Sequence, residues 1–92
     1  MTMVTVRYWA AAKQAAGVAE DVVSAKTLSG ALDAALSRRR GDRPARDTSD
    51  LAAVLARSSF LIDGNPVGRR APDSVPLHEA AVIEVLPPFA GG

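Results

Sequence analysis

The chain ends with residues 82–92, whose sequence is VIEVLPPFAGG. Apolar side chains alternate over Val82–Leu86 and predict a β-strand with Ile83 and Val85 facing the core. The next two residues are prolines, which end the strand and keep the chain extended because they lack a backbone N–H and have a fixed φ. Two glycines close the chain, so the sequence predicts a stiff apolar arm with a slim, flexible tip.

The other face of this final strand carries Leu86, and Pro87, Pro88 and Phe89 continue its apolar character. Exposed apolar surface of this kind often marks a binding site for a partner. We therefore expect Leu86 and the residues after it to contact another protein. The alternative is that Leu86 and Phe89 fold back onto the domain.

The rest of the chain shows strand and helix patterns in turn. Val4, Val6 and Tyr8 alternate with other residues, which predicts a first strand with these three side chains pointing inward. The expected elements before the last strand are a strand over 3–8, a short helix over 9–16 closed by Gly17, a strand over 18–25, a main helix, an exposed loop over 42–49, a shorter helix over 50–57, a strand over 59–63, a turn over 63–66, a brief strand at Val67 and an irregular stretch over 71–79.

The main helix is the most strongly marked element. Thr27 or Ser29 is expected to cap its N-terminus, and Gly41 is expected to stop it. Its apolar stripe recurs at three- and four-residue spacing and consists of Leu28, Ala31, Leu32, Ala35 and Leu36. The arginines at 38–40 lie near its C-terminal end, where positive charge complements the helix dipole, and we expect a solvated helix end there.

This order of elements predicts an α+β fold of the ubiquitin-like β-grasp type. In such a fold a mixed sheet packs one face on the main helix, and the last strand delivers the Gly-Gly tail straight out of the sheet. We expect residues 1–92 to form one domain, with residues 87–92 as its tail and a flexible Gly-Gly tip.

The composition argues against several classes of function. The 92-residue chain has a net charge of +1, which is not typical of a dedicated nucleic-acid binder. It has no cysteine, so it can form no disulfide and carry no sulfur on a thiol of its own. No stretch has the length of a membrane span, and residues 1–5 lack the features of a signal peptide, so we expect a cytoplasmic protein without a membrane partner. The single histidine, His78, lacks the spacing of a metal site, and no metal is expected.

Two stretches resemble one family, the MoaD/ThiS sulfur carriers, and look most like the small subunit of molybdopterin synthase (the MoaD type). Residues 6–17, VRYWAAAKQAAG, resemble the family's strand-then-helix opening, with aromatic residues at the strand end and a closing glycine. Residues 85–92, VLPPFAGG, are similar to the family's ending Phe-Pro-Pro-Val-Ala-Gly-Gly. The chain differs at Lys13-Gln14, where the family often has Arg-Glu, at residues 78–81, which replace an Asp-Gly-Asp turn, and in the longer loop over 42–49.

The resemblance implies a carrier that is a co-substrate rather than a catalyst. An ATP-dependent E1-like enzyme would adenylate the carboxylate of Gly92, and a persulfide donor would displace AMP to leave a C-terminal thiocarboxylate. The tail would then enter a pocket of a MoaE-type large subunit, in a heterotetrameric synthase, and its sulfur would attack a cyclic pyranopterin during molybdenum cofactor biosynthesis. The chain itself would bind no cofactor, and the catalytic groups would lie on the partners.

The resemblance also implies a role for each residue of the tail. Gly92 would carry the sulfur, and Gly91 would give clearance at the reaction centre. The four residues that would set the reach of the tail and dock it are Pro87, Pro88, Phe89 and Ala90. Leu86 would hold the large subunit, and Lys13 would contact the activating enzyme. Trp9 is expected to be a packing residue rather than a binding platform.

Three other functions remain open at this point. One is a sulfur carrier for cysteine or thiamine biosynthesis. Another is a ubiquitin-like modifier that forms isopeptide bonds with lysines of target proteins, because that chemistry also begins with adenylation. The third is an interaction domain in which the terminal glycines have no role.

Overall fold

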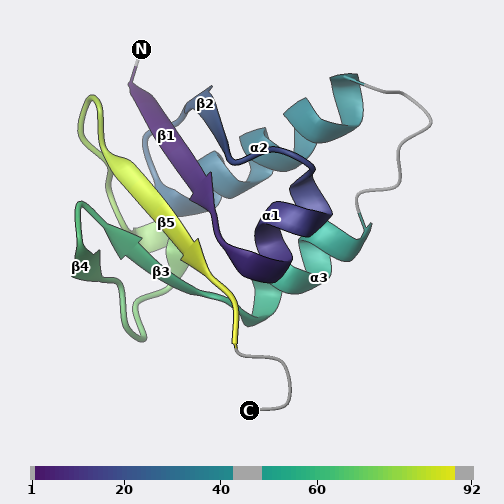
Figure 1. Cartoon of the computed structure of the whole chain (residues 1–92). Coiled ribbons are helices and arrows are strands. Elements are labelled where there is room, and N and C mark those ends of the chain that lie inside the picture. Colours follow the sequence, from purple (N-terminus) through teal and green to yellow (C-terminus); the bar gives the residue numbers. More distant parts are fainter. Residues whose placement is uncertain (1, 43–48, 89–92) are drawn as a thin grey trace.

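The computed structural model describes residues 2–42 and 49–88. Within these ranges a five-stranded mixed sheet has three α-helices on one side (Figure 1). The elements are β1 (Met3–Tyr8), α1 (Ala10–Ala16), β2 (Glu20–Ser24), α2 (Leu28–Asp42), α3 (Ser49–Arg57), β3 (Ser59–Ile62), β4 (Asn65–Pro66), a 3₁₀ turn η1 (Pro72–Ser74) and β5 (Val82–Leu86).

The strand order is β2-β1-β5-β3-β4, with β5 parallel to β1 and antiparallel to β3. The last strand in sequence therefore lies in the middle of the sheet, between the first strand and the third. Its core-facing side chains, Ile83 and Val85, are fully buried together with Val4 and Val6 of β1. These features confirm the expected ubiquitin-like β-grasp arrangement.

The bounds of β1 and β5 agree with the alternation in the sequence, and the expected turn after β3 is also present. Asp63 and Gly64 both have positive φ values, 51° and 84°, so the chain reverses within two residues. Pairing resumes at once, and β4 is Asn65–Pro66. The prediction that the brief strand starts at Val67 is wrong because the turn is this tight.

The main helix α2 begins as expected. The backbone N–H of Gly30 donates to Oγ1 of Thr27 at 3.1 Å, so Thr27 is the N-terminal cap. The predicted stop at Gly41 is wrong, because the helix continues through Gly41 to Asp42. Gly41 does not adopt the left-handed conformation in which a glycine usually ends a helix. Of the expected loop over 42–49, residues 43–48 lie outside the described part.

A buried polar cluster connects α2 to the sheet. The hydroxyl of Tyr8 donates to Asp21 Oδ2 at 2.8 Å, and Nη2 of Arg39 donates to Oδ1 at 2.9 Å. Nε of Arg38 donates to the same Oδ1 at 3.1 Å. Burial, followed by the hydrogen bond to Asp21, raises the pKa of Tyr8 well above its usual range.

The cluster corrects the prediction of a solvated arginine end for Arg39, whereas Arg38 and Arg40 are exposed as predicted. Arg39 is only 9% exposed and Asp21 only 4%, because β2 directs the Asp21 side chain toward the helices. A charged pair this deeply buried is stable only with good hydrogen bonds, which Asp21 receives from three donors.

In the described part of the chain, no helix combines the length and the apolar composition needed to cross a bilayer.

Candidate functional site

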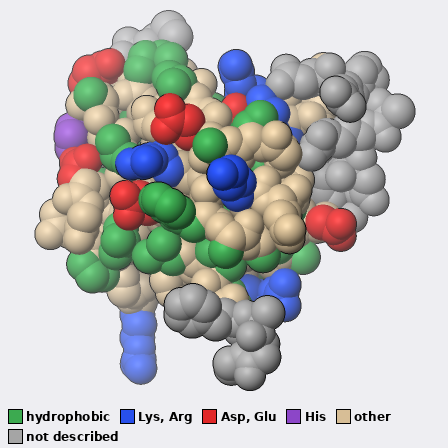
Figure 2. Space-filling view, viewed as in Figure 1, with side chains coloured by type: hydrophobic (Ala, Val, Ile, Leu, Met, Phe, Trp, Pro, Cys, Tyr) green, Lys and Arg blue, Asp and Glu red, His purple; other side chains and the backbone are tan. Residues whose placement is uncertain are grey.

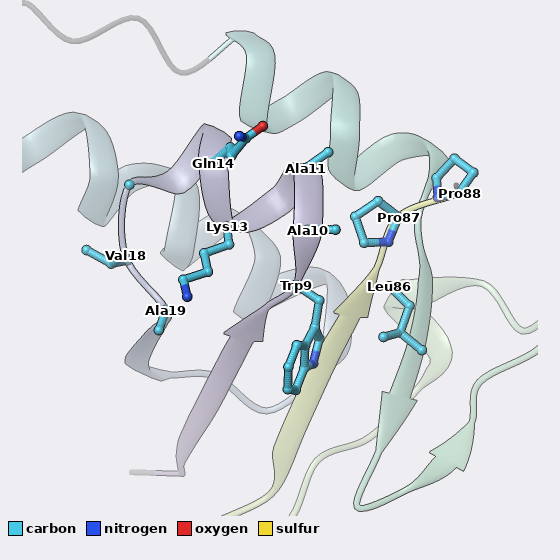
Figure 3. A pocket seen from close by; sticks show the side chains of 11 residues that line it. Trp9, Ala10, Ala11, Lys13, Gln14, Val18, Ala19, Leu86, Pro87 and Pro88 are labelled. Carbon is cyan, nitrogen blue, oxygen red and sulfur yellow. The ribbon is translucent and has the colours of Figure 1, made fainter. Parts of the chain in front are cut away.

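An open groove lies between α1 and the end of β5. Its volume is about 950 Å³. We call it the exit groove, and its lining residues are Trp9, Ala10, Ala11, Lys13, Gln14, Gly17, Val18, Ala19, Leu86, Pro87 and Pro88 (Figure 3).

The parallel pairing of β1 with β5 creates this groove. Parallel strands end at the same edge of a sheet, and Tyr8 of β1 lies opposite Val85 of β5. The next residues along the chain, Trp9 and Leu86, therefore lie side by side at this edge. Figure 3 shows the indole of Trp9 and the side chains of Leu86 and Pro87 along one side of the groove.

The short helix α1 forms the opposite wall. The chain turns sharply at Ala10, whose φ of 49° is unusual for a residue other than glycine. At the other end of α1, Gly17 has a φ of 79° and its N–H donates to the carbonyl of Lys13 at 2.9 Å. The chain then returns to the sheet, where the N–H of Tyr8 donates to the carbonyl of Ala19 at 2.9 Å. Lys13 is thereby fixed on the wall of the groove, as Figure 3 shows.

Trp9 is an exposed aromatic residue on the side of the groove that faces α1, together with Leu86 and Pro87. It is 44% exposed, and the guanidinium carbon of Arg7 lies 5.4 Å from the centre of its ring, within the range of a cation–π contact. Arg7 is itself positioned by Glu20 at 3.7 Å and Glu84 at 4.0 Å. The prediction that Trp9 packs in the interior is wrong. The signal that could have identified it is its place directly after the strand, where alternation no longer requires an inward side chain.

The lining of the exit groove suits the binding of a peptide or a protein. Lys13 is the one charged residue among the described residues that line it, and these include no carboxylate, hydroxyl, thiol or imidazole. Among these described residues, the Lys13 amine is the only group that could act as a general acid, base or nucleophile. An apolar surface beside a single cation can instead hold an extended peptide or a protein surface.

The structure brings together residues that the sequence pointed to separately. Lys13 and Leu86, which are far apart in the chain, line the same groove with Pro87 and Pro88. Leu86 and Pro87 are half-buried, and Pro88 is exposed. The other predicted site residues, Phe89, Ala90, Gly91 and Gly92, lie outside the described residues.

Several solved structures share the fold of this protein over almost the whole chain. The small archaeal modifier protein 1 (SAMP1) from Methanosarcina acetivorans is similar with a TM-score of 0.70 and 24% identity, and the match covers 100% of this chain and 98% of that one. This chain has the β-grasp fold. A chain of the complex of subunits 1 and 2 of molybdopterin-converting factor from Helicobacter pylori 26695 is similar with a TM-score of 0.61, at 21% identity and with 99% and 100% covered.

SAMP1 from Haloferax volcanii is also similar, with a TM-score of 0.68, 20% identity and coverage of 98% of this chain and 99% of that one. No family model and no curated protein matches the sequence. At these identities the similarity shows the shared fold, and the function has to be argued from the site.

Proposed function

We propose that this protein is a sulfur carrier whose C-terminal tail is its reactive group, and that it serves as the small subunit of a molybdopterin synthase. The observation that carries the proposal is the path of the chain after β5. This central strand ends at Leu86 beside the exit groove, and the sequence then continues through two prolines to Gly91 and Gly92. A rigid sheet thus positions the base of the arm, and two residues without side chains form its tip.

The proposed chemistry takes place at the carboxylate of Gly92. A carboxylate is a poor electrophile, so the activating enzyme first transfers AMP from ATP to it and releases pyrophosphate. A persulfide sulfur then attacks the carbonyl carbon and AMP leaves, which forms an acyl disulfide. A second thiol cleaves the sulfur–sulfur bond, so that the thiocarboxylate stays on Gly92 and the two thiols are left as a disulfide.

The exit groove gives the partners a surface to bind. The large subunit would cover Leu86, Pro87 and the exposed ring of Trp9 while the tail enters its pocket. The E1-like enzyme would use the same face, with Lys13 as the charged contact. Because Lys13 is the only titratable side chain among the described lining residues, the reaction would depend on groups that the partners supply. We place these steps in the cytoplasm, where ATP and persulfide donors are available together.

The experiment that tests the proposal is an intact-mass measurement. The protein is incubated with ATP, the E1-like enzyme of the same organism and a persulfide donor with a reducing thiol. We expect a mass gain that corresponds to the replacement of one oxygen by sulfur at Gly92. The loaded protein, mixed with the large subunit and the cyclic pyranopterin precursor, is then expected to yield molybdopterin.

Deletion of Gly92 is the matching variant. We expect it to abolish sulfur loading and molybdopterin formation, because the activated carboxylate would be displaced from the reaction centre. The melting curve and the affinity for the large subunit should stay unchanged, since β5 and the exit groove are intact. Normal cofactor synthesis by the shortened protein would sink the proposal.

A second candidate is a ubiquitin-like protein modifier, which the similarity to SAMP1 from two archaea supports. The same incubation separates the two. Adducts on lysines of other proteins, without a sulfur-containing carrier, would favour the modifier. A sulfur-loaded carrier that does not act on the pyranopterin would favour a pathway such as cysteine or thiamine biosynthesis.

A further inference from the structure

A second and smaller groove lies along β3. Its volume is about 380 Å³, and it is formed by the end of α3, the start of β3 and the loop after β4. Leu61, Pro66 and the buried Val67 contribute apolar walls, and Arg69 and Arg70 contribute charge. We call it the arginine groove.

The backbone holds the two arginines at this groove. Gly68 has a φ of 67°, which turns the chain directly after Val67. Nε of Arg70 donates to the carbonyl of Val67 at 3.0 Å, so the guanidinium is oriented by its own loop. Both arginines are exposed.

These arginines differ from the others described above. Arg7, Arg38 and Arg39 each lie within ion-pair distance of a carboxylate. Within residues 2–42 and 49–88, neither Arg69 nor Arg70 forms an ion pair, and no carboxylate lines the arginine groove. Arg57, which lies between the lining residues Ala56 and Ser58, is exposed and also lacks an ion pair with a described residue.

The arginine groove is adjacent to the base of the tail. Ser59, which lines it, is the β-ladder partner of Leu86, which lines the exit groove. A protein that surrounds the tail would therefore meet both grooves at once. Figure 2 shows basic side chains projecting from the lower edge of the molecule, the edge toward which β5 runs in Figure 1.

We propose that the arginine groove binds an acidic segment of the protein that receives the tail. This inference rests on the proposed function. Guanidinium groups that form no ion pair with the described residues and lie beside apolar walls suit a peptide that carries carboxylates, because arginine binds a carboxylate through two parallel hydrogen bonds. Nucleic acid fits less well, since the chain has a net charge of only +1. The groove would orient the partner and speed its approach, while the exit groove supplies the apolar contact.

The test is the double variant Arg69→Glu/Arg70→Glu, and the control is Lys26→Glu. Lys26 is exposed and lies just after β2, near the beginning of β1 and away from the base of the tail. Association with the E1-like enzyme and with the large subunit is measured by stopped-flow over a series of salt concentrations. Compared with the wild type, we expect the double variant to associate about tenfold more slowly or slower at low salt with the E1-like enzyme, the large subunit or both. Its association rate should also depend less on the salt concentration. The control should associate like the wild type.

Sulfur loading of Gly92 at saturating enzyme separates this inference from the proposed function. The double variant could load sulfur normally and associate with both partners at the same rates and with the same salt dependence as the wild type. That result would overturn the acidic contact and leave the carrier function standing. Wild-type protein that binds neither partner would overturn both. A gel shift with a single-stranded oligonucleotide that is lost in the double variant, while both partners still associate normally, would assign the groove to nucleic acid and overturn the inference as well.

Discussion

The two faces of the sheet place arginine–carboxylate pairs in different surroundings, buried on one face and exposed on the other. On the helix side, Asp21 is 4% exposed and accepts hydrogen bonds from Tyr8 and two arginines. On the open side, Arg7 lies between Glu20 and Glu84 with 45% of its side chain exposed. A buried carboxylate that loses a partner cannot be compensated by water, whereas an exposed one can. The first face therefore fixes the fold, and the second leaves side chains available for contact.

The largest expected effect breaks the buried side of this comparison. Asp21→Asn keeps the shape of the side chain but removes the negative charge beside the buried Arg39, so we expect a loss of about 3 kcal/mol in the free energy of unfolding. Urea denaturation followed by circular dichroism measures it. As a graded control, Tyr8→Phe removes one hydrogen bond from the same carboxylate and should cost about 1 kcal/mol. An Asn variant as stable as the wild type would show that the buried cluster does not fix the fold.

The next effect concerns binding at the open face. Leu86→Asp places a charge at the base of the tail, and we expect it to raise the Kd for the large subunit at least about tenfold, or 1.4 kcal/mol. Because Leu86 is only half-buried, the free energy of unfolding should change by less than about 1 kcal/mol. Titration calorimetry and urea denaturation measure the two quantities.

The matched control for Leu86 is Val22→Asp. Val22 is also apolar and is 50% exposed, but it lies on the edge strand β2 and does not line the exit groove. We expect this variant to bind the large subunit like the wild type. Equal affinity of the Leu86 variant and the wild type would remove the exit groove from the interface.

The smallest expected effect tests an exposed pair against the buried one. Nε2 of His78 contacts Oδ2 of Asp63, and its Nδ1 lies 2.8 Å from the carbonyl of Glu79. Both ring nitrogens thus face acceptors, which only the protonated imidazole satisfies. The side-chain hydrogen bond to Asp63, followed by the carbonyl of Glu79, raises the pKa of His78 above 6.5. The N–H of Val82, followed by His78, lowers the pKa of Asp63 below 3.8.

The pH dependence follows from the two directions. A raised histidine pKa stabilises the fold below pH 6.5, and this contribution is lost as the pH rises through the folded pKa of His78. A lowered aspartate pKa stabilises it above pH 3.8, and this contribution is lost as the pH falls through the folded pKa of Asp63. We expect His78→Gln to lower stability slightly near pH 5 and to have no effect near pH 9, in urea denaturation at both pH values.

The same pair can be followed directly. His78 is the only histidine in the sequence, so its ring resonances titrate without overlap from another imidazole. Its NMR titration should give a pKa above 6.5 in the wild type and a lower pKa in Asp63→Asn. Identical titration curves would mean that the contact with Asp63 does not form in solution.

Periodicity in the sequence predicted the elements that pack by regular alternation. The bounds of β1 and β5 follow from alternating apolar residues such as Val4, Val6 and Ile83, because each must face the same core. Thr27 was predicted as one of two possible caps, since a hydroxyl at that position satisfies a free helical N–H. The end of α2 was not predicted correctly, because its length depends on more than local preference.

The candidate site was predicted only as separate parts. Leu86, Pro87 and Pro88 stood out in the sequence because they form an apolar stretch after the last strand, where exposed apolar surface often marks a binding site. Lys13 was marked only by a resemblance, and Trp9 was assigned to packing. Their convergence on one groove depends on the parallel pairing of β1 with β5, which joins residues more than 70 positions apart. No local pattern contains that information.

The sequence by itself determined the alternation of the strands and the apolar stripe of the main helix, because these depend on neighbouring residues. The stiff arm that ends in Gly91 and Gly92 stays a prediction from the sequence. Only the tertiary structure decided that Trp9, Lys13 and Leu86 share a surface and that Arg39 is buried against Asp21. It also decided that Arg69 and Arg70 share a groove with Ser59, the ladder partner of Leu86. These outcomes depend on strand order and on how α2 lies against β2. The physical reason is that burial and pairing of a charged side chain are set by the elements packed around it, and identical arginines meet different surroundings.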